Sequence, residues 1–142
     1  MTGQAVICGK DLRNIDFRNA NLNNAKMLGV DLSHHDLSGA SLKNAFLKFS
    51  NLDGSNLSKA DLSGAKLIGA KIRGANLSYS NLYKANLYVA DLTSSDLSNS
   101  NLQYSILTNA ILANANLHNA DLKGAGTWRA NLNNCKNHPI CN

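Results

Sequence analysis

Cysteine and histidine residues near the C-terminus are spaced in a way that could bind a metal. Cys135, His138 and Cys141 form the pattern Cys-x2-His-x2-Cys, and His118 lies twenty residues before His138. Thiolates and imidazoles are the usual ligands of structural zinc, which takes four of them in a tetrahedron. The same residues allow two alternatives, a disulfide between Cys135 and Cys141 or two free thiols. We rank the disulfide above zinc because structural zinc sites usually show tighter, paired spacings. With Cys8 the number of cysteines is odd, so at least one stays unpaired.

Catalytic chemistry is not indicated by any other group of residues. No nucleophile, base and orienting group occur together, and no glycine-rich phosphate loop follows a strand pattern. Eight of the nine aspartates occupy one repeated position, so they do not form a separate acid–base pair. An active site needs convergent polar groups in a concave pocket. The chain is therefore predicted not to be an enzyme and to bind no cofactor.

The element that carries these residues has a period of five. In residues 60–74, ADLSGAKLIGAKIRG, the large apolar residues are Leu62, Leu67 and Ile72. A helix would place them about 3.6 residues apart and a strand about two. Every such centre from position 7 to position 132 is Leu, Ile, Phe or Met, except Thr127. The residue two before the centre (the small slot) is mostly Ala or Ser, and the residue just before it (the pre-centre slot) is mostly Asp or Asn.

A backbone with this period must turn a corner after each short extended segment. Four segments close a square coil of twenty residues, with the centre and the small slot pointing inward. Gly and Asn suit the corners, where unusual φ values are needed, and pre-centre Asp side chains are expected to hydrogen-bond the backbone there. Stacked coils pair along the axis at about 4.8 Å, so the twenty-six pentads predict about six and a half coils and a rod about 30 Å long.

The slots A/S-D/N-L-x-x resemble those of the pentapeptide-repeat family over residues 5–134. The resemblance implies an all-β fold, a right-handed quadrilateral β-helix, which we assign to residues 1–134. Lys10 and His35 in the small slot and Thr127 at a centre depart from the family pattern, which puts the local packing at these places in question. Many family members are cyanobacterial.

The end of the chain is predicted to be a cap. The repeat decays in residues 126–142, GTWRANLNNCKNHPICN. A stack of coils ends in unpaired backbone, which natural sheets usually cover. We therefore assign residues 135–142 to a C-terminal cap or tail and expect Trp128, Pro139 and Ile140 to fold over the last coil.

Large outward apolar residues fall on one side of the coil when they are sorted by the twenty-residue period. The other three sides display mainly Ser, Asn, Asp, Lys and Gly. A contiguous apolar surface is typical of a partner-binding site; the alternatives are scattered apolar residues that a sheet tolerates, or packing between copies in a crystal only. The residues of this surface, the apolar side, are Leu28, Phe46, Phe49, Ile68, Tyr88, Val89, Ile106 and Trp128.

The charge of the chain limits its partners. The net charge is +5, there is no glutamate, and the basic residues are spread over several sides. Nucleic-acid-binding proteins usually cluster such residues, so nucleic acid is not expected as a partner.

No apolar run approaches the roughly 18 residues of a membrane span, and no leader pattern opens the chain. We expect a cytoplasmic protein, with the periplasm or an organelle lumen as alternatives because a processed precursor also lacks its signal.

The sequence thus favours a non-catalytic protein-binding or scaffold protein, a rigid rod that presents its apolar side to a protein of unknown identity. The resemblance suggests an alternative, because some pentapeptide-repeat proteins imitate duplex DNA and protect DNA gyrase. The positive net charge argues against that role. A two-fold lateral pair would oppose Lys26, Lys48 and Lys66 to their own copies. We therefore expect a monomer, or a homodimer that is weak or made end to end.

Overall fold

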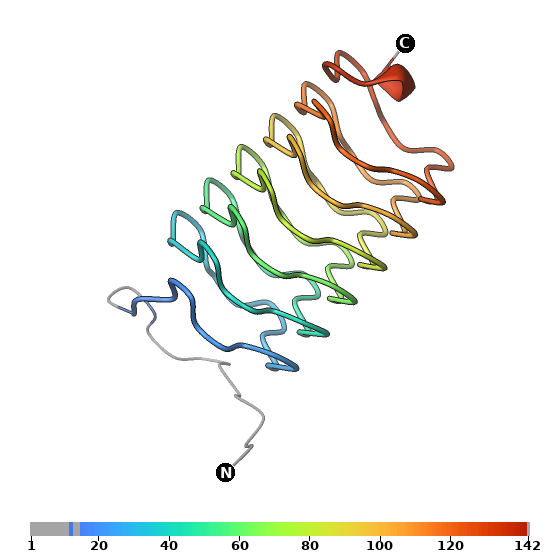
Figure 1. Ribbon diagram of the computed structural model, residues 1–142. Coiled ribbons are helices and arrows are strands. Elements are labelled where there is room, and N and C mark those ends of the chain that lie inside the picture. The colour runs from blue at the N-terminus through green and yellow to red at the C-terminus, as the bar shows by residue number, and fades with distance from the viewer. Residues whose placement is uncertain (1–11, 13–14, 142) are drawn as a thin grey trace.

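The chain forms a rod of stacked coils. A computed structural model describes residue 12 and residues 15–141, and Figure 1 shows the coils following one another along a single axis. Parallel β-bridges join each pre-centre residue to the residue twenty positions later, from Asn21–Ser41 to Asn116–Lys136. The predicted four-sided coil of twenty residues is therefore confirmed.

Regular elements are few in the described residues. All the strand pairing consists of isolated bridges, and the one helix is the short 3-10 helix η1, Pro139–Cys141. Within the described part of the chain, no helix has the length and apolar character needed to cross a membrane.

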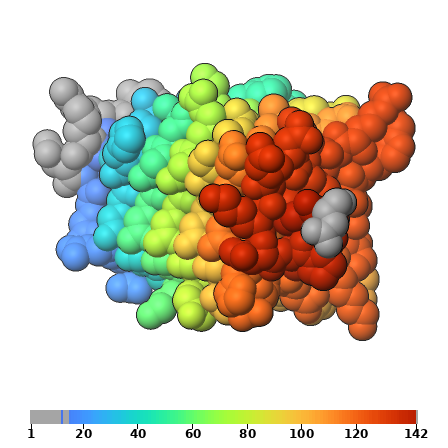
Figure 2. Space-filling model, turned by 90° about the horizontal axis from the view of Figure 1, so that it is seen from above, coloured from blue at the N-terminus to red at the C-terminus, as the bar shows by residue number. Residues whose placement is uncertain are grey.

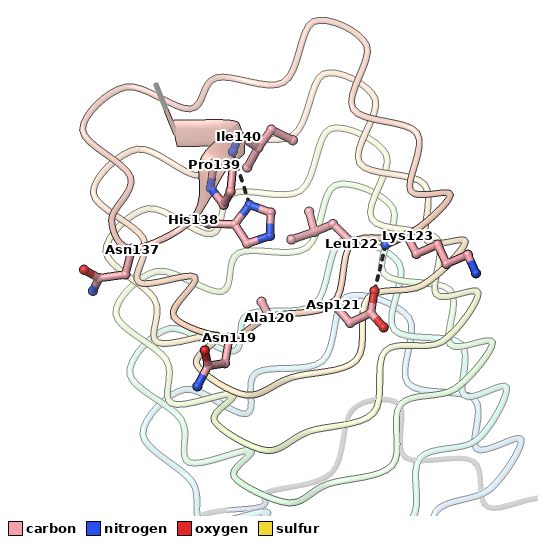
Figure 3. A pocket seen from close by; sticks show the side chains of 9 residues that line it. All are labelled: Asn119, Ala120, Asp121, Leu122, Lys123, Asn137, His138, Pro139 and Ile140. Atoms are coloured by element: carbon pink, nitrogen blue, oxygen red, sulfur yellow. Dashed lines mark hydrogen bonds between the residues drawn. The ribbon is translucent and has the colours of Figure 1, made fainter.

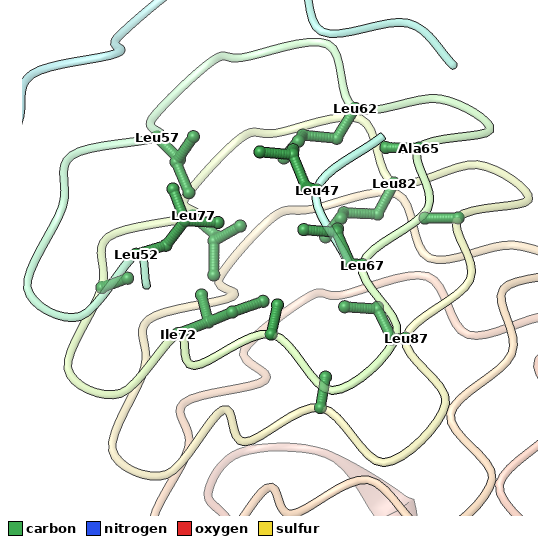
Figure 4. Close-up of a cluster of buried hydrophobic side chains, with 14 of the residues drawn as sticks. Leu47, Leu52, Leu57, Leu62, Ala65, Leu67, Ile72, Leu77, Leu82 and Leu87 are labelled. Atoms are coloured by element: carbon green, nitrogen blue, oxygen red, sulfur yellow. The ribbon is translucent and has the colours of Figure 1, made fainter. Parts of the chain in front are cut away.

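The interior is filled by the centres and the small slots, as the repeat predicts. Centres from Met27 to Leu117 are at most 1% exposed, and the alanines of the small slot are buried with them. Each centre stacks on the centre of the next coil, so that Leu47, Leu67 and Leu87 form one column (Figure 4). Burying each leucine contributes about 2 kcal/mol. The fold is thus stabilised by many similar contributions spread evenly along the rod.

Backbone N–H groups are satisfied by one scheme in a complete pentad. Three of the five donate along the axis to neighbouring coils, and one closes a four-residue turn. The fifth, on the residue just after the centre, donates to the side-chain oxygen of the pre-centre residue, which makes an Asx turn. In one pentad the five bonds are Asp61 to Ala40 (2.9 Å), Leu62 to Asn81 (2.7 Å), Ser63 to Asp61 Oδ1 (3.0 Å), Gly64 to Tyr83 (2.9 Å) and Ala65 to Leu62 (3.0 Å).

The corners have left-handed backbone at one position of every pentad. From residue 19 to residue 134, each residue two after a centre has φ between 51° and 71°. Gly and Asn hold most of these positions, because they tolerate this conformation best. A side chain in this position also lies over the residue of the next coil, so that a Cβ on Gly69 would stand 2.6 Å from the Phe49 ring.

The departures from the repeat pattern are accommodated locally. His35, in a small slot, is half-buried beside Phe17 (ring centroids 5.8 Å apart). Its ring nitrogens lie 2.9 Å from the Ser33 carbonyl oxygen and 3.0 Å from that of Leu12. Thr127 is half-buried at its centre in the last coil. Lys10 lies outside the described residues.

The C-terminal cap differs from the prediction in two respects. The coil continues beyond residue 134, because Cys135 fills a buried small slot and Lys136 pairs with Asn116. Trp128 does not cover the last coil: it keeps the outward position that the repeat gives it and is 63% exposed. Ile140, in η1, does pack against the end of the core. The space-filling view shows these last residues closing the near end of the stack (Figure 2).

Candidate functional site

The apolar side brings together the outward residues that the sequence predicts to share one face. Bridges join Lys26, Phe46, Lys66, Asn86, Ile106 and Gly126 in one column along this side. Ile68 is half-buried, and the other residues of the apolar side are between 41% and 63% exposed. The surface is a continuous strip over successive coils rather than a pocket.

Charge on this side is of one sign. The six described segments that form it run from residues 25–29 to residues 125–129 at intervals of twenty. They contain no acidic residue, although the chain has nine aspartates. Lys48 Nζ lies 4.8 Å from the centre of the Phe49 ring, and the Arg129 guanidinium lies 4.2 Å from that of Trp128. Cations over aromatic faces are attracted to the ring electrons. The apolar side therefore carries cationic groups that are held against its aromatic residues.

The Asx turn is largely absent from this side. The described pre-centre residues there are Lys26, Phe46, Lys66, Asn86, Ile106 and Gly126. Of these only Asn86 accepts a hydrogen bond from the backbone, from the N–H of Tyr88. On the other sides Asp or Asn fills this slot at most positions, and the bonds are 2.9–3.2 Å long. A repeat that loses this stabilising contact at five of six described positions on one side, but only at isolated positions elsewhere, suggests a function for that side.

Two corners of this side hold unfavourable residues. Phe49 and Val89 occupy the left-handed position with φ of 59° and 51°. For a β-branched residue such as Val89 this conformation is a genuine outlier. Such strain tends to persist at functional sites, where another constraint maintains it. Tyr79 and Tyr104 hold the same conformation on other sides, but Val89 is the one β-branched residue at such a corner within the described residues. The strained corner at Val89 is therefore the second feature that sets this side apart.

The described aspartates, all on the other three sides, are engaged in structure. The Ser33 hydroxyl and N–H both donate to Asp31 Oδ1, and these bonds lower the pKa of that carboxyl below its ordinary value. Burial alone would raise the pKa of Asp53, but bonds from the Arg73 guanidinium and N–H outweigh it and the pKa is lowered. Asp31 is a turn group, as the sequence predicts for the pre-centre aspartates. Asp53 lies outside that slot and instead forms an ion pair with Arg73.

The predicted zinc ligands do not form a metal site. Cys135 and Cys141 are joined by a disulfide with Cα atoms 5.2 Å apart, so neither sulfur is free as a thiolate. His138 Nδ1 accepts the N–H of Ile140, and His118 Nε2 lies near the Asn119 amide. In the described residues no three His, Cys, Asp or Glu side chains are grouped to hold an ion. Of the three possibilities that the sequence offers, zinc, a disulfide or free thiols, the structure contains the disulfide.

An open hollow of about 610 Å³ lies between η1 and the last coil (Figure 3). Two of its polar side chains are already used locally, because Asp121 accepts the Lys123 N–H and His138 accepts that of Ile140. The hollow has no convergent set of free catalytic groups. It is lined by Asn119, Ala120, Asp121, Leu122, Lys123, Asn137, His138, Pro139 and Ile140.

Sequence reasoning missed the lost Asx turns and Arg129. A signal for the lost turns was present, because sorting the pre-centre slot by the twenty-residue period separates one side without Asp from three sides with it. The stacking of Arg129 on Trp128 had no such signal, since side-chain direction does not follow from the repeat.

The coil geometry and the filled interior define a class, the four-sided β-helical repeat proteins. A family model described as pentapeptide repeats (8 copies) matches residues 4–34, 29–58, 36–67, 55–93 and 90–126. The chain belongs to the pentapeptide-repeat family, and its fold is the right-handed quadrilateral β-helix.

Solved structures of two cyanobacterial pentapeptide-repeat proteins are similar to this chain. HetL from Nostoc sp. strain PCC 7120, described as involved in heterocyst differentiation regulation, is 33% identical with a TM-score of 0.59. The match covers 81% of this chain but only 60% of HetL. Rfr23 from Cyanothece 51142 is 26% identical with a TM-score of 0.77, and the match covers 78% of this chain and 90% of Rfr23.

The remaining comparisons add nothing about function. QnrB1, a plasmid-mediated fluoroquinolone resistance protein, is 15% identical with a TM-score of 0.30, which is too low to support an argument. No curated protein sequence matches the chain.

Proposed function

We propose that this protein is a non-catalytic binding or scaffold protein whose apolar side docks against another protein. The observation that carries the proposal is the distribution of exposed apolar residues. Within the described residues, seven of the exposed large apolar side chains lie on this side, against four on the other three sides together. Burying a contiguous strip of aromatic and aliphatic groups is the usual source of affinity between proteins.

The shape of the rod supports the same function. The interior is filled by leucine and alanine, and the outward groups on the other sides are engaged in turns. HetL is described as involved in heterocyst differentiation regulation. We infer a role by binding for the present chain, and such a role needs no catalytic group. The cytoplasm remains the compartment we propose, although the Cys135–Cys141 disulfide suits an oxidising compartment better.

A pull-down with matched variants tests the proposal. The tagged protein, the double variant Phe46→Ser/Phe49→Ser and the control Tyr79→Ser/Tyr104→Ser are each incubated with lysate of the source organism. Tyr79 and Tyr104 are exposed aromatics in the same corner position as Phe49, but on other sides. We expect at least one protein that the wild type and the control retain equally and that the apolar-side variant retains about tenfold less.

Two results would contradict the proposal. Equal retention by all three proteins would show that the apolar side is not the docking surface. Sedimentation that reveals a tight dimer, lost only in Phe46→Ser/Phe49→Ser, would show that the side joins two copies of this chain instead.

A further inference from the structure

Several backbone N–H groups on the apolar side have no acceptor. The residue just after each centre donates its N–H to the pre-centre Asp or Asn elsewhere in the rod. On the apolar side this acceptor is missing wherever the pre-centre residue is not Asx. Within the described residues, the N–H groups left without a protein acceptor on this side are those of Leu28, Lys48, Ile68, Thr108 and Trp128.

The rest of the rod shows what these groups bind. The equivalent N–H groups of Ser33, Ser38 and Ser63 each contact a carboxylate oxygen at 2.9–3.0 Å. On the other sides three pre-centre residues of the coils are not Asx: Ser41, Lys71 and Ile111. Ser41 and Lys71 are compensated by side chains from the preceding coil, whereas Ile111 leaves the single N–H of Ala113 without a protein acceptor within the described residues. Asn23 accepts the Lys43 N–H, and Asp53 accepts that of Arg73. The apolar side has no such substitute, and its free donors recur from coil to coil.

Charge on the same side favours an anionic acceptor. Lys26, Lys48 and Lys66 form no salt bridge within the described residues, whereas Lys43 pairs with Asp61 and Arg73 with Asp53. The complete absence of acidic residues on this side leaves these ammonium groups without a counter-charge. A carboxylate placed near such cations and N–H donors gains charge-assisted hydrogen bonds.

We propose that the apolar side binds a segment of another protein in which acidic side chains alternate with apolar ones. This inference rests on the proposed function and names the chemistry of the partner. The partner's Asp or Glu oxygens take the places that Asx oxygens hold on the other three sides, beside Lys26, Lys48 and Lys66. Its apolar side chains cover Phe46, Phe49 and their neighbours.

Other occupants suit this side less well. A second copy of this chain would bring the same lysines together and supply no acid from its own apolar side. A nucleic acid or an anionic membrane would require a denser cluster of basic residues than four on the whole side. A protein segment with acidic and apolar side chains can bury the apolar strip, accept hydrogen bonds from the free N–H groups and pair with the lysines.

A peptide library displayed on phage tests the inference. Random peptides are selected on the whole protein and then measured against two charge variants by calorimetry. One variant is Lys26→Glu/Lys48→Glu/Lys66→Glu on the apolar side. The other, Lys59→Glu/Lys84→Glu/Lys123→Glu, changes the net charge equally on other sides. A third variant, Phe46→Asn/Ile106→Asn, supplies internal acceptors for the N–H groups of Lys48 and Thr108.

We expect the selected peptides to be rich in Asp or Glu next to aromatic or aliphatic residues. They should bind the apolar-side charge variant about tenfold more weakly, the charge control within about twofold, and the Phe46→Asn/Ile106→Asn variant more weakly than wild type. In amide NMR spectra of the complex, the free N–H groups, such as that of Lys48, should shift more than paired groups on other sides.

The outcomes separate the inference from the proposed function. Peptides that bind through Phe46 and Phe49 without enrichment in acidic residues would overturn the inference and leave the proposed function standing. If no selected peptide depends on the apolar side, both fail. If no peptide binds but vesicles of phosphatidylglycerol or a DNA duplex bind to the apolar side, the partner is a membrane or a nucleic acid and the inference is wrong.

Discussion

The distinguishing feature at the residue scale is the pre-centre slot. An Asp or Asn there satisfies the one N–H of the pentad that neither the neighbouring coils nor the four-residue turn uses. On the apolar side the slot holds residues such as Phe46 and Ile106 instead, and bulky residues occupy the left-handed corners at Phe49 and Val89. Each of these residues removes a hydrogen bond or adds backbone strain. The pentads of the apolar side should therefore contribute less stability than pentads with Asp or Asn before the centre and Gly or Asn at the corner.

Restoring the repeat on this side should therefore stabilise the protein. Ile106→Asn supplies an acceptor to the Thr108 N–H, and Val89→Asn relieves the strained corner, so each should raise the free energy of unfolding by about 0.5–1 kcal/mol. Urea titration measures both. Asn101→Ala, which removes the acceptor of the Gln103 N–H, is the opposite control and should destabilise. A loss of stability in both restored variants would show that these residues contribute to the fold and not to binding.

Acid should weaken the corners that aspartates hold. A carboxyl whose pKa is lower in the folded state binds fewer protons there than in the unfolded chain, so its stabilisation is complete above the unfolded value near pH 4 and is lost as the pH falls through the folded pKa. For Asp16, bonded by the Arg18 side chain, that pKa is about 2. The carboxyls with a lowered pKa are those of Asp16, Asp31, Asp36, Asp53, Asp61 and Asp121.

The urea midpoint is thus expected to fall between about pH 4 and about pH 2. Asp61→Asn, which keeps an acceptor for the Ser63 N–H, should make this fall shallower. A midpoint that does not change over this range would contradict the assignment of these carboxylates to the turns.

At the scale of the element, corresponding corners of neighbouring coils pack against each other. The side chain at a left-handed position lies over the corner of the next coil, and five such corners are occupied by glycine with a side chain within 3 Å of the missing Cβ. The Phe49 ring rests on Gly69 in this way, while Gly74 has open space around it. The orientation of Phe49 on the apolar side is therefore set by the next coil.

Substituting these two glycines separates backbone strain from contact. Gly74→Ala should cost about 1 kcal/mol because its φ is +61°. Gly69→Ala carries the same strain, with φ of +62°, and must also displace the Phe49 ring. It should be the less stable of the two in urea titration and should lose the partner retained by wild type, whereas Gly74→Ala should keep it. Indistinguishable behaviour in both measurements would mean that Gly69 does not position Phe49.

The five-residue period predicts which residues point inward, because a large apolar residue and a small Ala or Ser recur at fixed positions. The four sides and the handedness follow from the resemblance to the pentapeptide-repeat family, not from the period alone. The sequence also predicts the membership of the apolar side, since the register never slips. It does not predict the direction of every side chain. The sequence predicts that Trp128 folds over the last coil, but the coil continues to Lys136 and the indole points outward beside Arg129. The free N–H groups also need the three-dimensional bonding scheme to be recognised.

The whole molecule is a four-sided rod in which one side differs chemically from the other three. Three sides repeat turns that stabilise the stack, and one combines exposed apolar groups, unpaired lysines and free N–H donors. Because stability in such a stack is a sum over neighbouring coils, one side can depart from the repeat without loss of the fold. The central claim is that this side alone meets a partner.

Photo-crosslinking from each side tests that claim most directly. A photoreactive p-benzoylphenylalanine replaces one exposed, left-handed corner residue per variant: Phe49 on the apolar side, and Ser94, Tyr79 or Tyr104 on the other three. All four variants are irradiated in cells of the source organism, and covalent adducts are identified by mass. We predict a discrete adduct with another protein from position 49 and none above background from the other three. The same adduct from all four positions, or adducts only from positions 79, 94 or 104, would contradict the account.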